Sequence, residues 1–160
     1  MTTTYTLLAS NVLGTSSSSV TFSSISSSYR DLVLVVDVLA VSSTARANLR
    51  INSDSGTNYA LVGLYSGSAS FSPPGAGGFT NIQPNSEAST TNKASYTAQL
   101  LDYSVTDKHK MLLIRTSSST DASFTTWRWT NTAVINSIEI FATSSNFAVG
   151  SSFYLYGIVS

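Results

Sequence analysis

The segment from Leu32 to Val41 constrains the fold more than any other part of the sequence. Successive side chains of a β-strand point to opposite faces, and here both sets of positions are apolar, with Asp37 as the one charged interruption. A strand with one face in water would carry polar residues at every other position. The segment therefore suits either the middle of a sandwich or a contact between subunits.

The rest of the sequence also favours strands. Glu, Lys and Met are scarce, whereas Ser and Thr make up about a third of the chain and aromatic residues 11%. Short segments of strand character recur at near-regular spacing: Val20–Ser23, Leu32–Val41, Leu49–Ile51, Tyr59–Tyr65, Ser95–Tyr103, His109–Thr116, Phe124–Thr130, Val134–Phe141 and Phe153–Val159. We predict an all-β fold, an antiparallel β-sandwich with the jelly roll as the leading topology and a barrel as the alternative.

The chain length of 160 residues predicts one domain, with Met1–Thr4 as a flexible N-terminal arm. Ser66–Gly78 and Pro84–Lys93 are rich in Pro, Gly or Ser and are predicted to be long loops. Asn52–Asn58 resembles a calcium loop, but its glycine falls one position early and no glutamate follows at the required distance. We expect a hairpin turn held by its own Asn and Asp side chains, joining the strands before and after it.

The charge balance excludes several classes of partner. Eight basic and eight acidic residues cancel, and charged residues are 10% of the chain, against roughly 25% in an average soluble protein. We therefore expect neither nucleic acid nor a membrane as a partner. No cysteine is present, so disulfides and zinc-thiolate sites are excluded. The first ten residues lack the apolar stretch of a secretory signal, and no run is long enough to span a bilayer.

Catalytic groups are few, and we predict that the protein is not an enzyme and has no cofactor or metal. His109 is the single histidine, and Asp107 lies two residues before it, which could place both on one side of an extended segment. The simpler interpretation makes His109 an ordinary residue at a strand edge. Asp37 would be unusual if buried, and Arg46 or Arg50 is its expected structural partner.

Trp127 and Trp129 flank an arginine in a predicted strand, so both indoles point to one face. They could stack on sugar rings, but large aromatic side chains also dominate cores and subunit contacts. We expect packing or assembly and place both among the candidate interface or packing residues, together with Tyr5, Val33 and Val35. The tyrosines at 154 and 156 are expected to belong to a packed last strand.

Several stretches, in order from one end of the chain to the other, resemble small virion structural proteins of tailed bacteriophages. They are Tyr29–Leu34, Leu49–Tyr59, Ile138–Ile140, Asn146–Phe153 and Leu155–Ile158. The resemblance includes a hydrophobic strand followed by an Asn-x-Asp turn and a tyrosine, and a Leu-Tyr-Gly near the end.

The resemblance implies a β-sandwich that forms symmetric oligomers on a virion made in the host cytoplasm. We expect a homo-oligomer, with a trimer favoured, that binds the major capsid protein as a decoration or cement protein and stabilises the shell. The alternative is a tail-fibre or receptor- and glycan-binding tail component. Other virion proteins are further expected partners, and the capsid surface is favoured over the tail.

Overall fold

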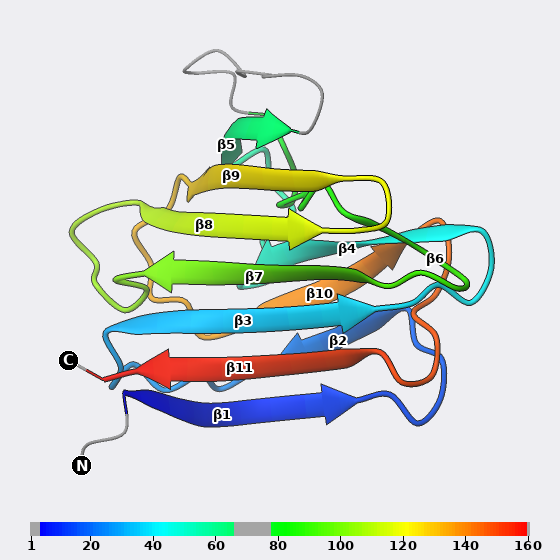
Figure 1. Cartoon of the computed structure of the whole chain (residues 1–160). Helices are drawn as coiled ribbons and strands as arrows, with labels where there is room; N and C mark the ends of the chain where they lie inside the picture. Colours follow the sequence, from blue (N-terminus) through cyan, green and yellow to red (C-terminus); the bar gives the residue numbers. More distant parts are fainter. Residues whose placement is uncertain (1–3, 66–77, 160) are drawn as a thin grey trace.

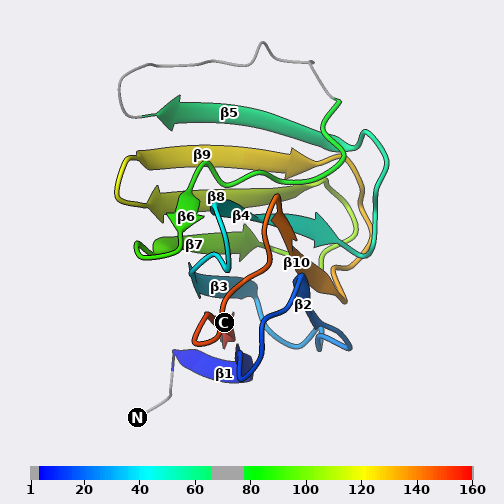
Figure 2. The same cartoon turned by 90° about the vertical axis from the view of Figure 1, so that its right-hand side faces the viewer.

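The computed structural model describes residues 4–65 and 78–159. Within these residues the chain forms β-strands and loops and no helix, so no helix is present that could cross a membrane. The strands are arranged as one antiparallel sheet of seven strands and a second antiparallel sheet of four, stacked face to face (Figures 1 and 2). The predicted all-β antiparallel sandwich is confirmed.

Eleven strands make up the two sheets. In chain order they are β1 (Tyr5–Val12), β2 (Ser19–Phe22), β3 (Asp31–Val38), β4 (Thr44–Ile51), β5 (Tyr59–Tyr65), β6 (Glu87–Ser89), β7 (Ala94–Leu101), β8 (Lys110–Ser117), β9 (Ala122–Trp129), β10 (Ile138–Thr143) and β11 (Ser152–Ile158).

The strand order is that of a jelly roll. Eight strands, which follow one another along the chain as β1, β2, β3, β4, β6, β7, β10 and β11, give the spatial orders β1-β11-β3-β7 and β2-β10-β4-β6. The larger sheet then continues beyond β7 through β8, β9 and β5. As a result β1 and β5 are its two edges and β7 is the fourth of its seven strands (Figure 1).

The predicted hairpin between Leu49–Ile51 and Tyr59–Tyr65 is wrong. Those segments belong to β4 and β5, which lie in different sheets, so the residues 52–58 carry the chain from one layer to the other. Turn chemistry in a sequence shows that the chain reverses, but the same residues serve a hairpin and an arch between sheets equally well.

Other strand boundaries also differ from the prediction. β1 was not predicted, because most of its side chains are exposed or half-buried and its apolar residues do not alternate cleanly. The three-residue β6 lies inside the predicted loop Pro84–Lys93. β10 begins at Ile138, four residues later than expected, and β3 ends at Val38. The predicted loop Ser66–Gly78 lies outside the described residues apart from Gly78, and so does the predicted arm apart from Thr4.

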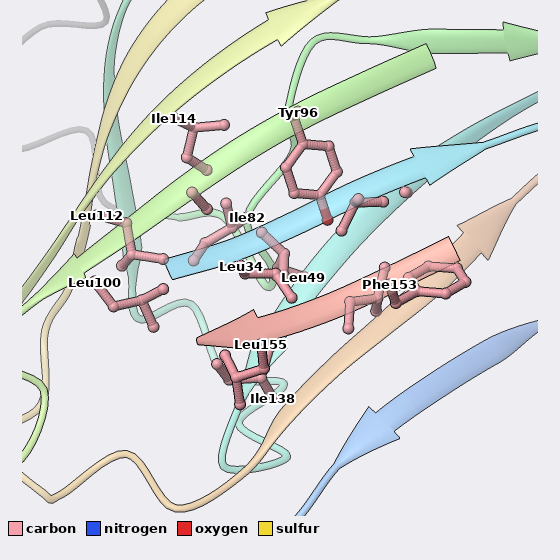
Figure 3. Packing of buried hydrophobic residues seen from close by; sticks show 14 of the residues in the cluster. Leu34, Leu49, Ile82, Tyr96, Leu100, Leu112, Ile114, Ile138, Phe153 and Leu155 are labelled. Atoms are coloured by element: carbon pink, nitrogen blue, oxygen red, sulfur yellow. The ribbon is translucent and has the colours of Figure 1, made fainter. Parts of the chain in front are cut away.

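The core lies between the sheets, where one set of alternate side chains from each strand meets the other layer. Leu32, Leu34, Val36 and Val38 of β3 are all buried. Figure 3 shows Leu34 of β3 and Leu49 of β4 in the core. One face of the doubly apolar segment is therefore covered within a single chain.

The segment before β3 meets the last strand in the structure. The ring of Tyr29 packs against Gly157 so closely that a Cβ there would lie 2.5 Å from it. The Tyr59 hydroxyl accepts a hydrogen bond from the Ile51 backbone N–H (3.1 Å) and donates one to the Asp54 carbonyl (3.0 Å). These contacts tie Tyr29 to β11 and join β5 to the end of β4.

Candidate assembly surface

Trp127 and Trp129 point into the core, with exposed fractions of 0% and 1%. The Trp127 indole N–H donates to the Thr125 hydroxyl (3.2 Å), and the ring of Phe79 meets Trp127 edge to face with centroids 5.3 Å apart. Neither indole has a face open to solvent. Both are therefore packing residues in this fold, and neither is a platform for a sugar.

Trp129 also holds the turn between β4 and β5. Its indole N–H donates to the carboxylate of Asp54 (2.7 Å), which accepts further hydrogen bonds from the Gly56 backbone N–H (2.9 Å) and the Asn58 amide (2.9 Å). Burial opposes ionisation of this carboxyl, but the three donors outweigh it and lower the pKa of Asp54. The Asn and Asp side chains of this segment thus stabilise the turn itself, as expected.

The groups considered for catalysis lie on the surface. His109 and Asp107 are both exposed in the loop before β8. The residues that the structure describes contain no group of three His, Cys, Asp or Glu side chains that could hold a metal ion.

Asp37 has a different partner from the one expected. Its carboxylate accepts hydrogen bonds from the Lys93 ammonium (2.6 Å) and the Ser95 hydroxyl (2.9 Å), whereas Arg46 and Arg50 pair with glutamates of the smaller sheet. The prediction failed because β4, which carries both arginines, lies in the other layer. Asp37 is partly exposed at one end of β3.

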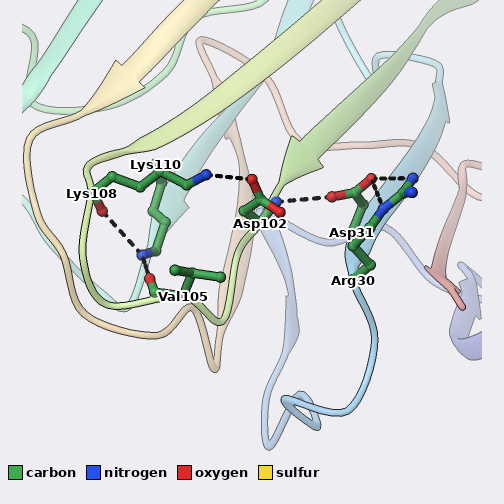
Figure 4. Close-up of polar contacts among 6 residues, drawn as sticks. All are labelled: Arg30, Asp31, Asp102, Val105, Lys108 and Lys110. Atoms are coloured by element: carbon green, nitrogen blue, oxygen red, sulfur yellow. Dashed lines mark hydrogen bonds and ion pairs between the residues drawn. The ribbon is translucent and has the colours of Figure 1, made fainter. Parts of the chain in front are cut away.

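A polar network ties the other ends of β3 and β7 together (Figure 4). The buried Asp31 carboxylate pairs with Arg30 (2.9 Å) and accepts a hydrogen bond from the Asp102 backbone N–H (2.9 Å). Asp102 in turn pairs with Lys108 (2.5 Å), and the hydrogen bond from Lys108 lowers the pKa of Asp102. The network fixes the loop between β7 and β8.

Lys110 completes this network from inside the sandwich. Its side chain is 1% exposed, and its ammonium donates to the backbone carbonyls of Val105, Thr132 (3.0 Å) and Lys108 (3.4 Å). Burial lowers the pKa of this lysine. The acceptors are backbone carbonyls of two loops, so Lys110 anchors these loops. None of its three acceptors is a side chain that could act in acid-base catalysis.

The side of the larger sheet that points away from the smaller sheet is called the outer face here, and it carries most of the exposed apolar side chains. Of the eleven large apolar side chains that are exposed in the described part of the chain, seven lie on it: Tyr5, Leu7, Val12, Val62, Leu64, Met111 and Phe124. Val33 and Val35 lie half-buried on the same face, paired across the strands with Tyr156 and Tyr154. The structure thus brings Tyr5, Val33 and Val35 to one surface and places the two tryptophans on the opposite side of the sheet.

The inter-strand register orders these residues into rows across the sheet. One row runs through Leu7, Tyr156, Val33, Gln99, Leu113, Thr126 and Val62. The next runs through Ser10, Tyr154, Val35, Thr97, Arg115, Phe124 and Leu64. Apolar residues flank a polar centre formed by β7, where Asp37, Thr97 and Arg115 line a shallow hollow of about 270 Å³.

Most of this surface was missed by sequence reasoning. Tyr154 and Tyr156 were expected inside a packed strand, but they alternate with the buried Phe153 and Leu155 and lie half-exposed on the outer face. The missed signal is that β11 is apolar at both sets of alternate positions, as β3 is.

Comparisons with known proteins bear on the fold alone. No family model matches the chain, and no curated protein matches its sequence. An exo-inulinase from Aspergillus awamori superposes with a TM-score of 0.51 at 13% identity, over 96% of this chain and 29% of the inulinase, so the chain spans less than a third of that enzyme. A sialidase carbohydrate-binding domain from Ruminococcus gnavus, bound to α2,3-sialyllactose, gives a TM-score of 0.36 at 7% identity, over 84% of this chain and 80% of that domain. The likeness to the inulinase supports a β-sandwich fold.

Proposed function

We propose that this chain is a non-enzymatic structural protein of a bacteriophage virion, which decorates the assembled capsid and stabilises it. The observation that carries the proposal is the outer face, where most of the exposed large apolar side chains are gathered on one broad sheet. Exposed apolar surface of this extent is typical of a site of protein association.

Two further features support an assembly role. The residues that carry the resemblance to virion proteins, such as Tyr29, Tyr59 and Gly157, maintain the sandwich and take part in no candidate reaction centre. Net charge is zero, so attachment would depend on shape and on many simultaneous contacts. An oligomer placed on a capsid symmetry axis would engage several subunits of the major capsid protein at once.

The alternative is a tail component that binds a receptor glycan. Tyr154 and Tyr156 are the observation in its favour, because two half-exposed aromatic rings lie two residues apart on one face. Rings so placed could stack on sugars. A variant with both tyrosines changed to serine would lose retention on host polysaccharide if this alternative were correct.

The test uses expanded, undecorated heads of the phage that encodes the chain. Co-sedimentation is expected with intact heads and much less with free capsid subunits, and bound heads should rupture at a higher temperature. Absence of binding to heads, with labelling of the tail in complete virions, would move the protein to the tail. Hydrolysis of a host polysaccharide by the purified protein would overturn the non-enzymatic assignment.

A further inference from the structure

We propose that the outer face is the contact through which two copies of this chain form a two-fold symmetric dimer. This inference rests on the proposed assembly function and deepens it by naming the first partner as a second copy. It replaces the trimer expected from sequence, because a trimer needs two different surfaces to meet, whereas one self-complementary face gives a two-fold pair.

The smaller sheet provides an internal comparison. Its outer side carries the ion pairs Arg46–Glu87 (3.7 Å) and Arg50–Glu139 (2.8 Å), and the Arg50 guanidinium lies 4.5 Å from the ring centre of Phe141. The outer side of the smaller sheet is therefore polar and suited to contact with solvent. The outer face of the larger sheet is apolar although it belongs to the same chain. Neither the overall composition nor the sandwich fold therefore explains the difference in polarity between the two sheets.

The position of β7 suggests how two copies would meet. Stacked sheets keep their strands within about 30° of each other, so two outer faces can pack around a two-fold axis that runs along β7. Because β7 is the fourth of seven strands, this axis lays β3 over β8 of the second copy, β11 over β9 and β1 over β5.

The rows of the outer face are complementary in part under this operation. Leu7 meets Val62 and Val33 meets Leu113 of the second copy, all from one row. In the next row Tyr154 meets Phe124, an aromatic pair. On the axis itself the polar residues of β7, Thr97 and Gln99, meet their own copies. Three of the six pairs away from the axis are thus apolar on both sides, and the other three set an apolar residue against a polar one: Tyr156 against Thr126, Leu64 against Ser10 and Val35 against Arg115.

The charges of the outer face agree with the same arrangement. Val35 lies over Arg115 of the second copy, and Asp37 is the next residue along β3 on that face. Arg115 has no ion pair within the described residues, and the carboxylate of Asp37, which also pairs with Lys93 of its own chain, adds an opposite charge near it. Each contact occurs twice in a two-fold dimer, and the net charge of zero gives no long-range repulsion between copies.

The extent of the sheet is also that of one stable interface. Six inter-strand spacings give a width of about 29 Å, and eight-residue strands give a length of about 24 Å. The product is about 700 Å², close to the roughly 800 Å² that each partner buries in a standard protein interface. A second copy therefore fits the whole face.

The test is the mass in solution, measured by light scattering at tens of micromolar, together with variants. The unmodified chain is expected to have twice its mass of 16.9 kDa. Leu7→Lys and Val62→Asp change side chains that are 52% and 47% exposed, so each variant should fold, as far-UV circular dichroism can verify. Each should raise the dimer dissociation constant about 100-fold, because every substitution enters the contact twice.

The double variant, Leu7→Lys with Val62→Asp, tests the register of the contact. Positions 7 and 62 lie on opposite edges of one sheet, so the introduced ammonium and carboxylate can pair only between copies. The double variant should therefore dimerise within about tenfold of the unmodified chain. Val149→Lys is the matched control, since Val149 is 59% exposed and lies outside the outer face; it should leave the dimer intact.

Three results would overturn the proposal: a monomer or trimer for the unmodified chain, dimers that withstand Leu7→Lys, or a double variant no stronger than the single ones. If the unmodified chain is a monomer that still binds capsid heads, and Leu7→Lys abolishes this binding, then the outer face is the surface that binds the capsid. That result would leave the proposed function standing while removing this inference.

Discussion

Replacing Asp54 by alanine tests whether one carboxylate couples the turn between the sheets to the tryptophan core. The Trp129 indole N–H, at 2.7 Å from this carboxylate, is buried and would lose its partner, whereas Asn58 and the Gly56 N–H are near enough to solvent to bind water. An unpaired buried donor costs about 1–3 kcal/mol. We therefore expect Asp54→Ala to lower the free energy of unfolding by about 2 kcal/mol, or the melting temperature by about 4–8 °C.

The assay is urea unfolding followed by tryptophan fluorescence at one fixed protein concentration. Trp129→Phe removes the donor itself, so the double variant with Asp54→Ala should cost less than the sum of the two single variants by about 1 kcal/mol. Asp107→Ala is the control, because Asp107 is exposed and its loss changes the net charge equally. If the losses of unfolding free energy in the two single variants add up to the loss in the double variant, within a few tenths of a kcal/mol, the coupling between Asp54 and Trp129 is refuted.

Three further measurements test the same carboxylate and the packing around it. The pKa of Asp54 is lower in the folded chain than its ordinary value of 3.8, so its contribution is present above pH 3.8 and is lost as the pH falls through the folded pKa. Acid should therefore destabilise the unmodified protein more than Asp54→Asn, and equal acid sensitivity of the two would contradict this account. Trp127→Ala should cost about 3–5 kcal/mol, seen as a lower melting temperature, because it opens a cavity in the core; unchanged melting with lost polysaccharide retention would contradict the packing role. Gly157→Ala should cost about 1–3 kcal/mol, since its Cβ would meet the Tyr29 ring, and Tyr29→Leu in the same chain should recover part of that loss; a Gly157→Ala protein as stable as the unmodified one would show that the ring can move freely.

The fold class could be predicted because local preference and alternation agree along most of the chain. Val20 and Phe22 alternate with polar residues and form β2, and Tyr59–Tyr65 has the same limits as β5. Pairing between distant strands could not be predicted, since it depends on contacts that no local pattern encodes. The turn after Ile51 shows this, because its residues suit a hairpin but lead the chain into the other sheet.

The candidate surface was only partly predictable, for a reason that lies in the strands themselves. A strand that is apolar at both sets of alternate positions has one more apolar face than the core of its own sandwich needs. β3, β5 and β11 have this character, β8 has it in part through Met111 and Leu113 on its outward side, and all four belong to the larger sheet.

The strands of the smaller sheet differ, since β2, β4 and β10 place Ser, Thr, Arg or Glu at most of their outward positions. Strands that are apolar at both sets of alternate positions therefore indicate which of the two sheets they join. Read in β3 alone, this pattern indicated either the middle of a sandwich or a contact between subunits. Reading it in all four strands places apolar residues on both sides of the polar centre formed by β7, because neighbours in a sheet share their alternation through the register. Under the proposed two-fold contact, a charge placed at either edge of the sheet, at position 7 or 62, should therefore weaken the association, because apolar residues extend to both edge strands.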